Sequence, residues 1–241
     1  MAALEARHLA DLRFPDVTRA LRALSSAYVE RRATLARGAA LAGTGKRAAF
    51  ALFYGPLHYL VVRHVVGALP DATGGLPSLI DLGCGTGASG AAWADACTTT
   101  TPHVIGVDRN SWALAEAMRT YRDFRLQARV RRDDITTVKL HTGRALILVA
   151  FALNELSDGA RDRLLPRFLE RIAQGDRVLV VEPLAGFVAP WWRRWQESFQ
   201  SVGGRADEWR FRADLPPIVA KLDRAAGLHH GELTGRSLWS G

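Results

Sequence analysis

Residues 81–87 read Asp-Leu-Gly-Cys-Gly-Thr-Gly and follow a short apolar run. Glycine has no Cβ, so it allows the backbone to turn tightly and to approach a ligand closely. The residues after Gly87 predict a helix, and the free N–H groups at a helix N-terminus attract an anion such as a carboxylate. The loop between Asp81 and Gly87 therefore predicts a binding site for a small ligand.

Acidic side chains follow the next two predicted strands. Asp108 lies 21 residues after Gly87 at the end of an apolar run, where a carboxylate can accept hydrogen bonds from the hydroxyl groups of a ribose. Asp133 and Asp134 end the third predicted strand, and either can accept a hydrogen bond from an adenine amino group, with Ile135 beside the ring. Acids at three successive strand ends predict a ligand that contains a nucleoside.

The loop and these acids together resemble the signature of class I S-adenosylmethionine (SAM)-dependent methyltransferases over about residues 78–240. A dinucleotide-binding loop has the different spacing G-x-G-x-x-G. The resemblance implies SAM as the cofactor and an α/β, Rossmann-like class I methyltransferase fold, whose mostly parallel seven-stranded sheet carries helices on both faces. It implies these cofactor-binding residues: Asp81, Gly83, Cys84, Gly85 and Gly87 around the methionine part, Asp108 on the ribose, Asp133 or Asp134 on the adenine with Ile135, and Arg109 and Phe151 beside them.

Three further segments, at residues 24–31, 150–156 and 180–183, resemble a narrower family of methyltransferase-like proteins. That family is associated with the small ribosomal subunit and includes mitochondrial assembly factors, so the resemblance implies RNA or ribosome binding. The chain departs from the family because it has no counterpart of the later cysteine cluster that holds an iron–sulfur centre. Its two cysteines are Cys84 and Cys97.

The candidate catalytic residues are Asn154, Glu155 and Glu182, which follow the fourth and fifth predicted strands. Methyl transfer from SAM mainly requires that the acceptor be positioned, and a general base is needed only where the acceptor loses a proton. Asn154 or Glu155 could hold an acceptor amine or hydroxyl, although a capping or ion-pair role explains Glu155 almost as well, and Glu182 is in a comparable position. The sequence indicates no metal site, because its seven histidines lack zinc-binding spacing.

Short apolar runs alternate with amphipathic stretches from residue 78 onward. We expect strands at 78–82, 103–107, 127–132, 145–153 and 177–182, with helices at 88–97, 112–121 and 159–173. Such alternation predicts a mostly parallel sheet. Residues 1–70 predict a helical N-terminal extension, with one helix at 17–37 and another at 46–69 broken at Gly55-Pro56. Residues 71–241 then form the methyltransferase domain, which ends with a helix at 215–227 and a hairpin of 229–233 with 237–239.

A segment rich in tryptophan and arginine, residues 183–213, interrupts the predicted domain. It holds four of the seven tryptophans, with five arginines between them. Aromatic rings between arginines can stack on bases and hold phosphates, and Trp191, Trp192 and Trp195 could equally cover a pocket for an apolar small molecule. Packing of one amphipathic helix on the sheet is the third interpretation.

The chain is basic, with 32 Lys and Arg against 24 Asp and Glu and a net charge of +8. Such a charge attracts phosphates, so we expect RNA or the small ribosomal subunit to bind the N-terminal helices and the 183–213 segment. An arginine-rich genome is the alternative explanation. Two cysteines and the lack of a signal peptide predict a cytoplasmic location. Residues 48–69 are apolar but contain His58, Arg63 and His64, which favours a buried helix and no membrane partner.

These observations predict a SAM-dependent methyltransferase that acts on ribosomal RNA of the small subunit. Two other functions stay open at this stage. One is methyl transfer to a small molecule, with the extension and the tryptophans covering the pocket. The other is a ribosome assembly factor that binds SAM without catalysis.

Overall fold

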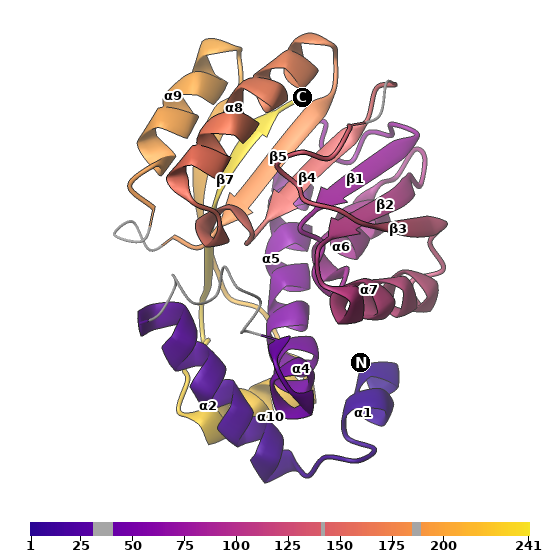
Figure 1. The fold of residues 1–241 in the computed structure, drawn as a ribbon, viewed down its shortest axis with the longest axis vertical. Helices are drawn as coiled ribbons and strands as arrows, with labels where there is room; N and C mark the ends of the chain where they lie inside the picture. The colour runs from indigo at the N-terminus through magenta and orange to yellow at the C-terminus, as the bar shows by residue number, and fades with distance from the viewer. Residues whose placement is uncertain (31–40, 141–142, 185–188) are drawn as a thin grey trace. The chain divides into compact units, whose positions relative to one another are not determined.

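The structure is a computed structural model that describes residues 1–30, 41–140, 143–184 and 189–241. These residues form two compact units (Figure 1). The first comprises Met1–His58 and Phe211–Leu233, and the second comprises Tyr59–Arg210 and Thr234–Gly241. The extension expected at residues 1–70 overlaps the first unit without coinciding with it. Residues 31–37 of the first expected helix lie outside the described residues.

The first unit is helical. Its helices are α1 (Ala2–His8), α2 (Phe14–Glu30), α4 (Thr44–Ala49) and α10 (Pro217–Ala226). Helix α2 buries Val17, Leu21 and Leu24 completely, at the spacing of one helix face. It packs on α4 and on α10, a helix that lies almost 200 residues later in the chain.

The expected break at Gly55-Pro56 is wrong. A π-helical turn, η2 (Phe50–Tyr54), joins α4 to α5 (Gly55–Ala68), and Gly55 itself keeps helical angles. Proline has no N–H and its ring clashes with the carbonyl four residues earlier in an α-helix; the wider π turn before Pro56 relieves that clash. The stretch Thr44–Ala68 is long and apolar enough to span a membrane by length and composition, but 61% of its most apolar window is buried, and a core helix passes the same test.

The second unit is built on a seven-stranded sheet with the order β3-β2-β1-β4-β5-β7-β6. Its strands are β1 (Ser78–Leu82), β2 (His103–Asp108), β3 (Ala128–Arg132), β4 (Leu146–Ala150), β5 (Arg177–Glu182), β6 (Arg205–Phe211) and β7 (Leu233–Ser240). Strands β1 to β5 pair in parallel, and β7 pairs antiparallel with β5. The mostly parallel Rossmann-like sheet predicted from the sequence is confirmed.

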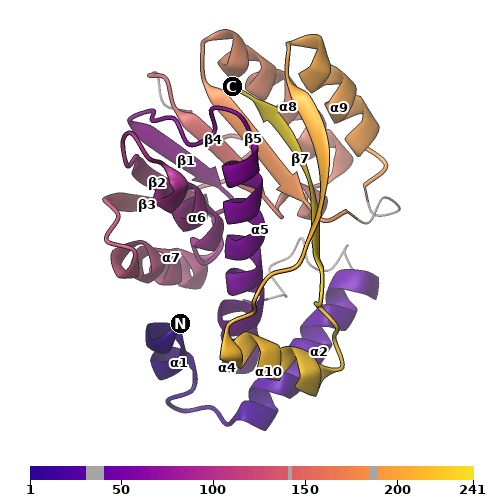
Figure 2. The same cartoon turned by 180° about the vertical axis from the view of Figure 1, so that it is seen from behind.

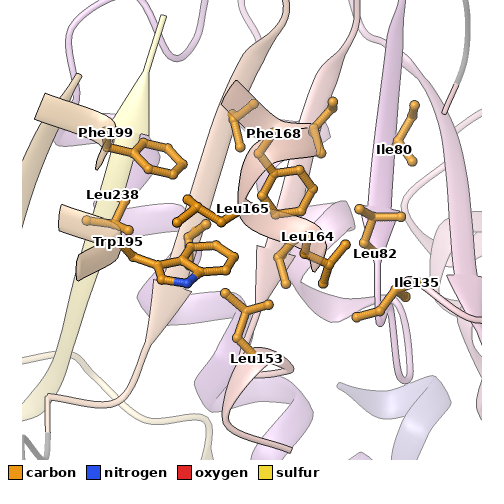
Figure 3. Close-up of a cluster of buried hydrophobic side chains, with 14 of the residues drawn as sticks. Ile80, Leu82, Ile135, Leu153, Leu164, Leu165, Phe168, Trp195, Phe199 and Leu238 are labelled. Atoms are coloured by element: carbon orange, nitrogen blue, oxygen red, sulfur yellow. The ribbon is translucent and has the colours of Figure 1, made fainter. Parts of the chain in front are cut away.

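Helices cover both faces of the sheet. One face packs against α8 (Asp158–Ala173) and α9 (Trp192–Ser201), where Phe168, Trp195 and Phe199 join the strand side chains in one core cluster (Figure 3). On the opposite face, the end of α5 from Tyr59 and α6 (Ala88–Ala96) lie over the strands (Figure 2). Helix α7 (Ser111–Asp123) packs on β2 and β3. Because all five residues of β4 are buried, this strand forms the centre of the domain.

The C-terminal hairpin predicted from residues 229–233 and 237–239 is wrong. Residues Leu233–Ser240 form the single strand β7, which pairs with β5 from Val178 opposite Ser240 to Glu182 opposite Arg236. The segment Thr234-Gly235-Arg236 that suggested a turn lies inside this strand. Pairing with a strand more than 50 residues earlier in the chain therefore outweighs the local turn preference.

Candidate cofactor site and active site

The glycine loop joins β1 to α6 at the carboxyl end of β1. Gly83, Gly85 and Gly87 have φ angles of 75°, 51° and 78°, a conformation that costs little only for glycine. A Cβ on Gly83 would lie 2.7 Å from Cβ of Ala152, and one on Gly87 would lie 3.0 Å from Cα of Ala117. Only glycine therefore fits at Gly83 and Gly87, and glycine lets a ligand approach the backbone closely.

Asp81 and Cys84 lie beneath this loop, inside the protein. The side chain of Asp81 accepts hydrogen bonds from the N–H of Gly90 (3.0 Å) and the hydroxyl of Tyr121 (3.2 Å). Burial raises the pKa of Asp81 to about 7. Burial also raises the pKa of the Cys84 thiol well above its ordinary value. In this structure Asp81 therefore holds the first turn of α6, while its contact with a methionine moiety stays a prediction.

Asp108 connects the glycine loop to the end of β2. One carboxylate oxygen accepts from the N–H of Gly85 (3.0 Å) and the other accepts from the N–H of Asn110 (2.8 Å). Asn110 in turn caps α7 by accepting from the N–H groups of Trp112 and Ala113. The carboxylate of Asp108 is thereby fixed beside the loop, and each oxygen keeps a lone pair that a ribose hydroxyl can use.

The acids after β3 are held by their neighbours. Asp134 accepts from the N–H (2.8 Å) and the hydroxyl (2.7 Å) of Thr136, and these bonds lower its pKa. Asp134 also pairs with Arg109 at 3.5 Å, and Asp133 pairs with Arg131. The N–H of Asp133 donates to the carbonyl of Asp108 at 3.1 Å, which places the ends of β2 and β3 together, and Ile135 is buried. The residues predicted to bind ribose and adenine therefore lie together at the carboxyl ends of β2 and β3.

Phe151 begins the turn after β4 in a left-handed conformation, with φ at 57°. Its N–H donates to the carbonyl of Val181 at 2.8 Å. An aromatic residue in this conformation is strained. The turn continues through Ala152, which faces Gly83, into the short 3-10 helix η3 (Leu153–Glu155). Two of the candidate catalytic residues lie on η3, next to the cofactor loop.

The structure places Asn154 and Glu155 in different surroundings. The pKa of Glu155 is raised to about 7, chiefly by burial and also by the charge of Asp108, while the charge of Arg109 acts in the opposite direction. Glu155 is therefore within electrostatic range of the predicted ribose site. Asn154 instead forms hydrogen bonds with Glu182 of β5 and with Trp191, which immediately precedes α9.

Glu182, the third candidate, is completely buried. Its oxygens accept from the N–H of Leu153 (2.8 Å) and from the side-chain amide of Asn154 (2.6 Å). The pKa of Glu182 is raised to about 8, chiefly by burial and also by the charge of Glu155, against the lowering effect of its hydrogen bonds from Leu153 and Asn154 and of the charge of Arg236. The catalytic roles expected for the three residues stay predictions, but the geometry ties Glu182 to Asn154.

Sequence reasoning missed several residues around this cluster. Arg161 of α8 donates to the carbonyl groups of Leu153 and Leu156 and lies over the ring of Trp191 at 5.3 Å. Arg236 lies over the ring of Trp192 at 4.1 Å. No local motif marks either arginine, because Arg236 reaches the site only through the pairing of β7 with β5. Among the residues that the structure describes, no group of three or more His, Cys, Asp or Glu side chains could hold a metal ion.

Comparison with known proteins agrees with this geometry. Residues 79–175 match a family model described as a methyltransferase domain. No curated protein matches the chain. Among solved structures, the mitomycin 7-O-methyltransferase MmcR is 16% identical with a TM-score of 0.56, and the match covers 99% of this chain and 70% of that one.

Two further solved structures resemble the chain. The SAM-dependent methyltransferase SibL, in its apo form, is 20% identical with a TM-score of 0.50. The match covers 82% of this chain, which spans only 57% of SibL. The N-methyltransferase NodS from Bradyrhizobium japonicum WM9, solved with S-adenosyl-L-homocysteine, is 14% identical with a TM-score of 0.50, covering 76% of this chain and 87% of NodS. At these identities the three structures show a shared fold.

Proposed function

We propose that this chain, whose residues 79–175 match a methyltransferase domain, transfers the methyl group of SAM to RNA, with the small ribosomal subunit as the favoured source. In this proposal the glycine loop holds the methionine part of SAM, Asp108 the ribose, and Asp133 or Asp134 the adenine. SAM supplies a methyl group that is already activated by the sulfonium. The chain's own residues then have to bind, orient and shield the acceptor.

An arginine-rich edge of the sheet carries this proposal. We call it the arginine strip: Arg109, Arg119, Arg122, Arg125, Arg129, Arg131 and Arg132. All seven residues are exposed, and three of them form ion pairs: Arg109 with Asp134, Arg119 with Glu116, and Arg131 with Asp133. The strip follows α7 and the edge strand β3, beside the strand ends that carry Asp108 and Asp133. Exposed arginines on neighbouring elements attract the phosphates of a nucleic acid.

Three members of the strip, Arg122, Arg125 and Arg129, have no ion-pair or hydrogen-bonding partner for their side chains among the described residues. Phe124 lies between them in sequence and is 38% exposed, although it is a large apolar side chain. Its ring stacks on Tyr59 with centroids 5.2 Å apart. An exposed ring among unpaired arginines is the combination with which proteins bind single-stranded RNA.

The acceptor would lie beside η3 at the end of β4. A side-chain amide such as that of Asn154 can orient an acceptor amine or hydroxyl through one donor and one acceptor. Glu155, with its pKa near 7, can take a proton from the acceptor at neutral pH. These two residues are the ones that we assign to the acceptor.

Transfer of a tritiated methyl group from SAM tests the proposal. The substrate is a lysate from cells that lack this gene, separated into ribosomal subunits, free RNA, protein and small molecules. We expect ribonuclease-sensitive label in the small-subunit fraction, and we expect Asp108→Ala to abolish it. Label that survives ribonuclease, or that appears in another fraction alone, would refute the RNA proposal.

A small-molecule acceptor is the second candidate, and one observation favours it. Trp191 lies 5.5 Å from Trp192 and 5.3 Å from Trp195, ring centre to ring centre, and stays partly exposed beside Asn154. An aromatic cluster with one polar group is typical of a small-molecule pocket. In the same assay this candidate predicts label in the small-molecule fraction only.

A further inference from the structure

The side-chain amide of Asn154 is held from two sides. Its nitrogen lies 2.6 Å from a carboxylate oxygen of Glu182, and its oxygen lies 3.2 Å from the indole nitrogen of Trp191. Asn154 belongs to η3, Glu182 ends β5, and Trp191 immediately precedes α9. Three separate elements therefore meet at one amide group.

The chemistry of the partners allows only one orientation of this amide. An indole N–H can only donate, so it must face the carbonyl oxygen of Asn154. The amide nitrogen then faces Glu182. One carboxyl oxygen of Glu182 accepts from the side chain of Asn154, and the other accepts from the N–H of Leu153. A reversed amide would set two donors against each other at Trp191, so the indole alone fixes the orientation of this amide.

The partners are themselves held in place. The guanidinium of Arg161 covers the ring of Trp191 and donates to the carbonyl of Leu153 at 2.9 Å. Glu182 is completely buried, and it lies opposite Arg236 in the antiparallel ladder. These contacts restrict the side chains of Glu182 and Trp191, and the two side chains therefore hold the amide of Asn154 in one orientation.

We infer that Glu182 and Trp191 are positioning residues, which orient the amide of Asn154 so that its second N–H and its second lone pair face the methyl acceptor. Two residues before Asn154, Ala152 touches the cofactor loop at Gly83, so the amide lies next to where the methyl group is delivered. The inference rests on the proposed methyl transfer, but it does not depend on which class of acceptor is used.

Exchanging the polar groups tests this inference. Glu182→Gln keeps the size of the side chain but replaces one carboxyl oxygen, which accepts through a lone pair, by an NH2 group that only donates. The amide of Asn154 can then no longer satisfy both neighbours. The double variant Glu182→Gln with Asn154→Asp restores both bonds, and only the bond between positions 154 and 182 changes direction. The carboxylate introduced at position 154 accepts from the amide introduced at position 182 and, as in the wild type, from the indole of Trp191. Glu208→Gln is the matched control, since Glu208 is an exposed acid on β6.

Two readouts separate orientation from mere packing. The first is the ¹⁵N–¹H signal of the Trp191 indole, assigned with Trp191→Phe. We expect this signal to shift in Glu182→Gln and to return in the double variant. The second is tritium transfer to whichever lysate fraction the wild type labels. We expect a loss of roughly 100-fold in kcat for Glu182→Gln, with SAM affinity in calorimetry within about twofold of the wild type.

The double variant decides between the roles. Because the carboxylate introduced at position 154 cannot donate to the acceptor, we expect the double variant to regain the indole signal but not the transfer rate. Recovery of the transfer rate would overturn the contact between Asn154 and the acceptor. Wild-type kcat in Glu182→Gln, or an unshifted indole signal, would overturn the positioning role. Absence of label in RNA for the wild type would refute the proposed acceptor alone, because the indole result is independent of it.

Discussion

Raising the pH from 5 to 9 should destabilise the fold, and Glu182 should account for much of the loss. The ordinary pKa of this carboxyl is 4.5, and burial raises it to about 8 in the folded chain. Between these values the unfolded chain has released the proton while the folded chain retains it. The stability that the protonated form contributes is therefore fully present below pH 4.5 and is lost as the pH rises towards 8.

The size of this loss follows from the two pKa values. A difference of about 3.5 pH units corresponds to a change on the order of 5 kcal/mol in the free energy of unfolding. Asp81 and Glu155 add to it with the same sign, since burial raises each pKa to about 7. Because a typical domain is stable by about 5–15 kcal/mol, the fold should be much weaker at pH 9 than at pH 5.

Urea denaturation between pH 5 and pH 9 measures this effect. Glu182→Gln has no proton to lose, so its free energy of unfolding should fall less steeply with pH than that of the wild type. The donor conflict at Asn154 lowers the stability of this variant at every pH and leaves the slope unaffected. Glu208→Gln should retain the wild-type slope. Parallel pH profiles for the wild type and Glu182→Gln would show that Glu182 is ionised in the fold, and our reasoning would be refuted.

Three further results are expected. Asp108→Ala should weaken SAM binding in calorimetry by about 2–5 kcal/mol through the loss of two charge-assisted hydrogen bonds, and unchanged affinity would exclude Asp108 from the ribose site. Gly83→Ala should abolish SAM binding, because its φ is 75° and its new Cβ would lie 2.7 Å from that of Ala152; retained binding would show that the loop adjusts. Reversal of Arg122, Arg125 and Arg129 to Glu should weaken binding of a fluorescent single-stranded RNA and reduce its salt slope by about 2–3. The matched reversal of Arg193, Arg194 and Arg205, which lie in the 183–213 segment and pair with Glu197, Asp162 and Asp207, should have less effect. Equal losses would contradict a specific role for the strip.

The cofactor site could be predicted from the sequence because its signals are local. The glycines of the 81–87 loop have positive φ angles, which few other residues adopt. Each predicted acid lies at the carboxyl end of its strand: Asp81 in β1, Asp108 in β2, and Asp133 directly after β3. The parallel pairing of β1 to β5 follows from the strand–helix alternation, whereas their order in the sheet was not predicted. Local pattern therefore specifies the half of the sheet that holds the cofactor loop.

The acceptor side could not be predicted in the same way. Asn154 and Glu155 are neighbours in sequence, but the 3-10 turn sends one towards β5 and the other towards Asp108. Arg236 arrives through an antiparallel pairing with Glu182. Strand β6 lies inside the 183–213 segment, for which no strand was predicted, because pairing at the sheet edge decides its conformation.

The first unit is assembled from both ends of the chain, and this has a consequence for synthesis. Helix α10 lies between β6 and β7 in sequence, yet its buried residues Ile218, Val219 and Leu222 belong to the unit that begins at Met1. A nascent chain emerges from its N-terminus onward, so the apolar face of α2 is made about 200 residues before α10, on which it packs. Helix α4 is made early and covers part of that face, but the part that α10 covers stays exposed until translation passes residue 226. Any fragment that ends before residue 211 leaves the α10-covered part of α2 exposed, and we expect such fragments to aggregate.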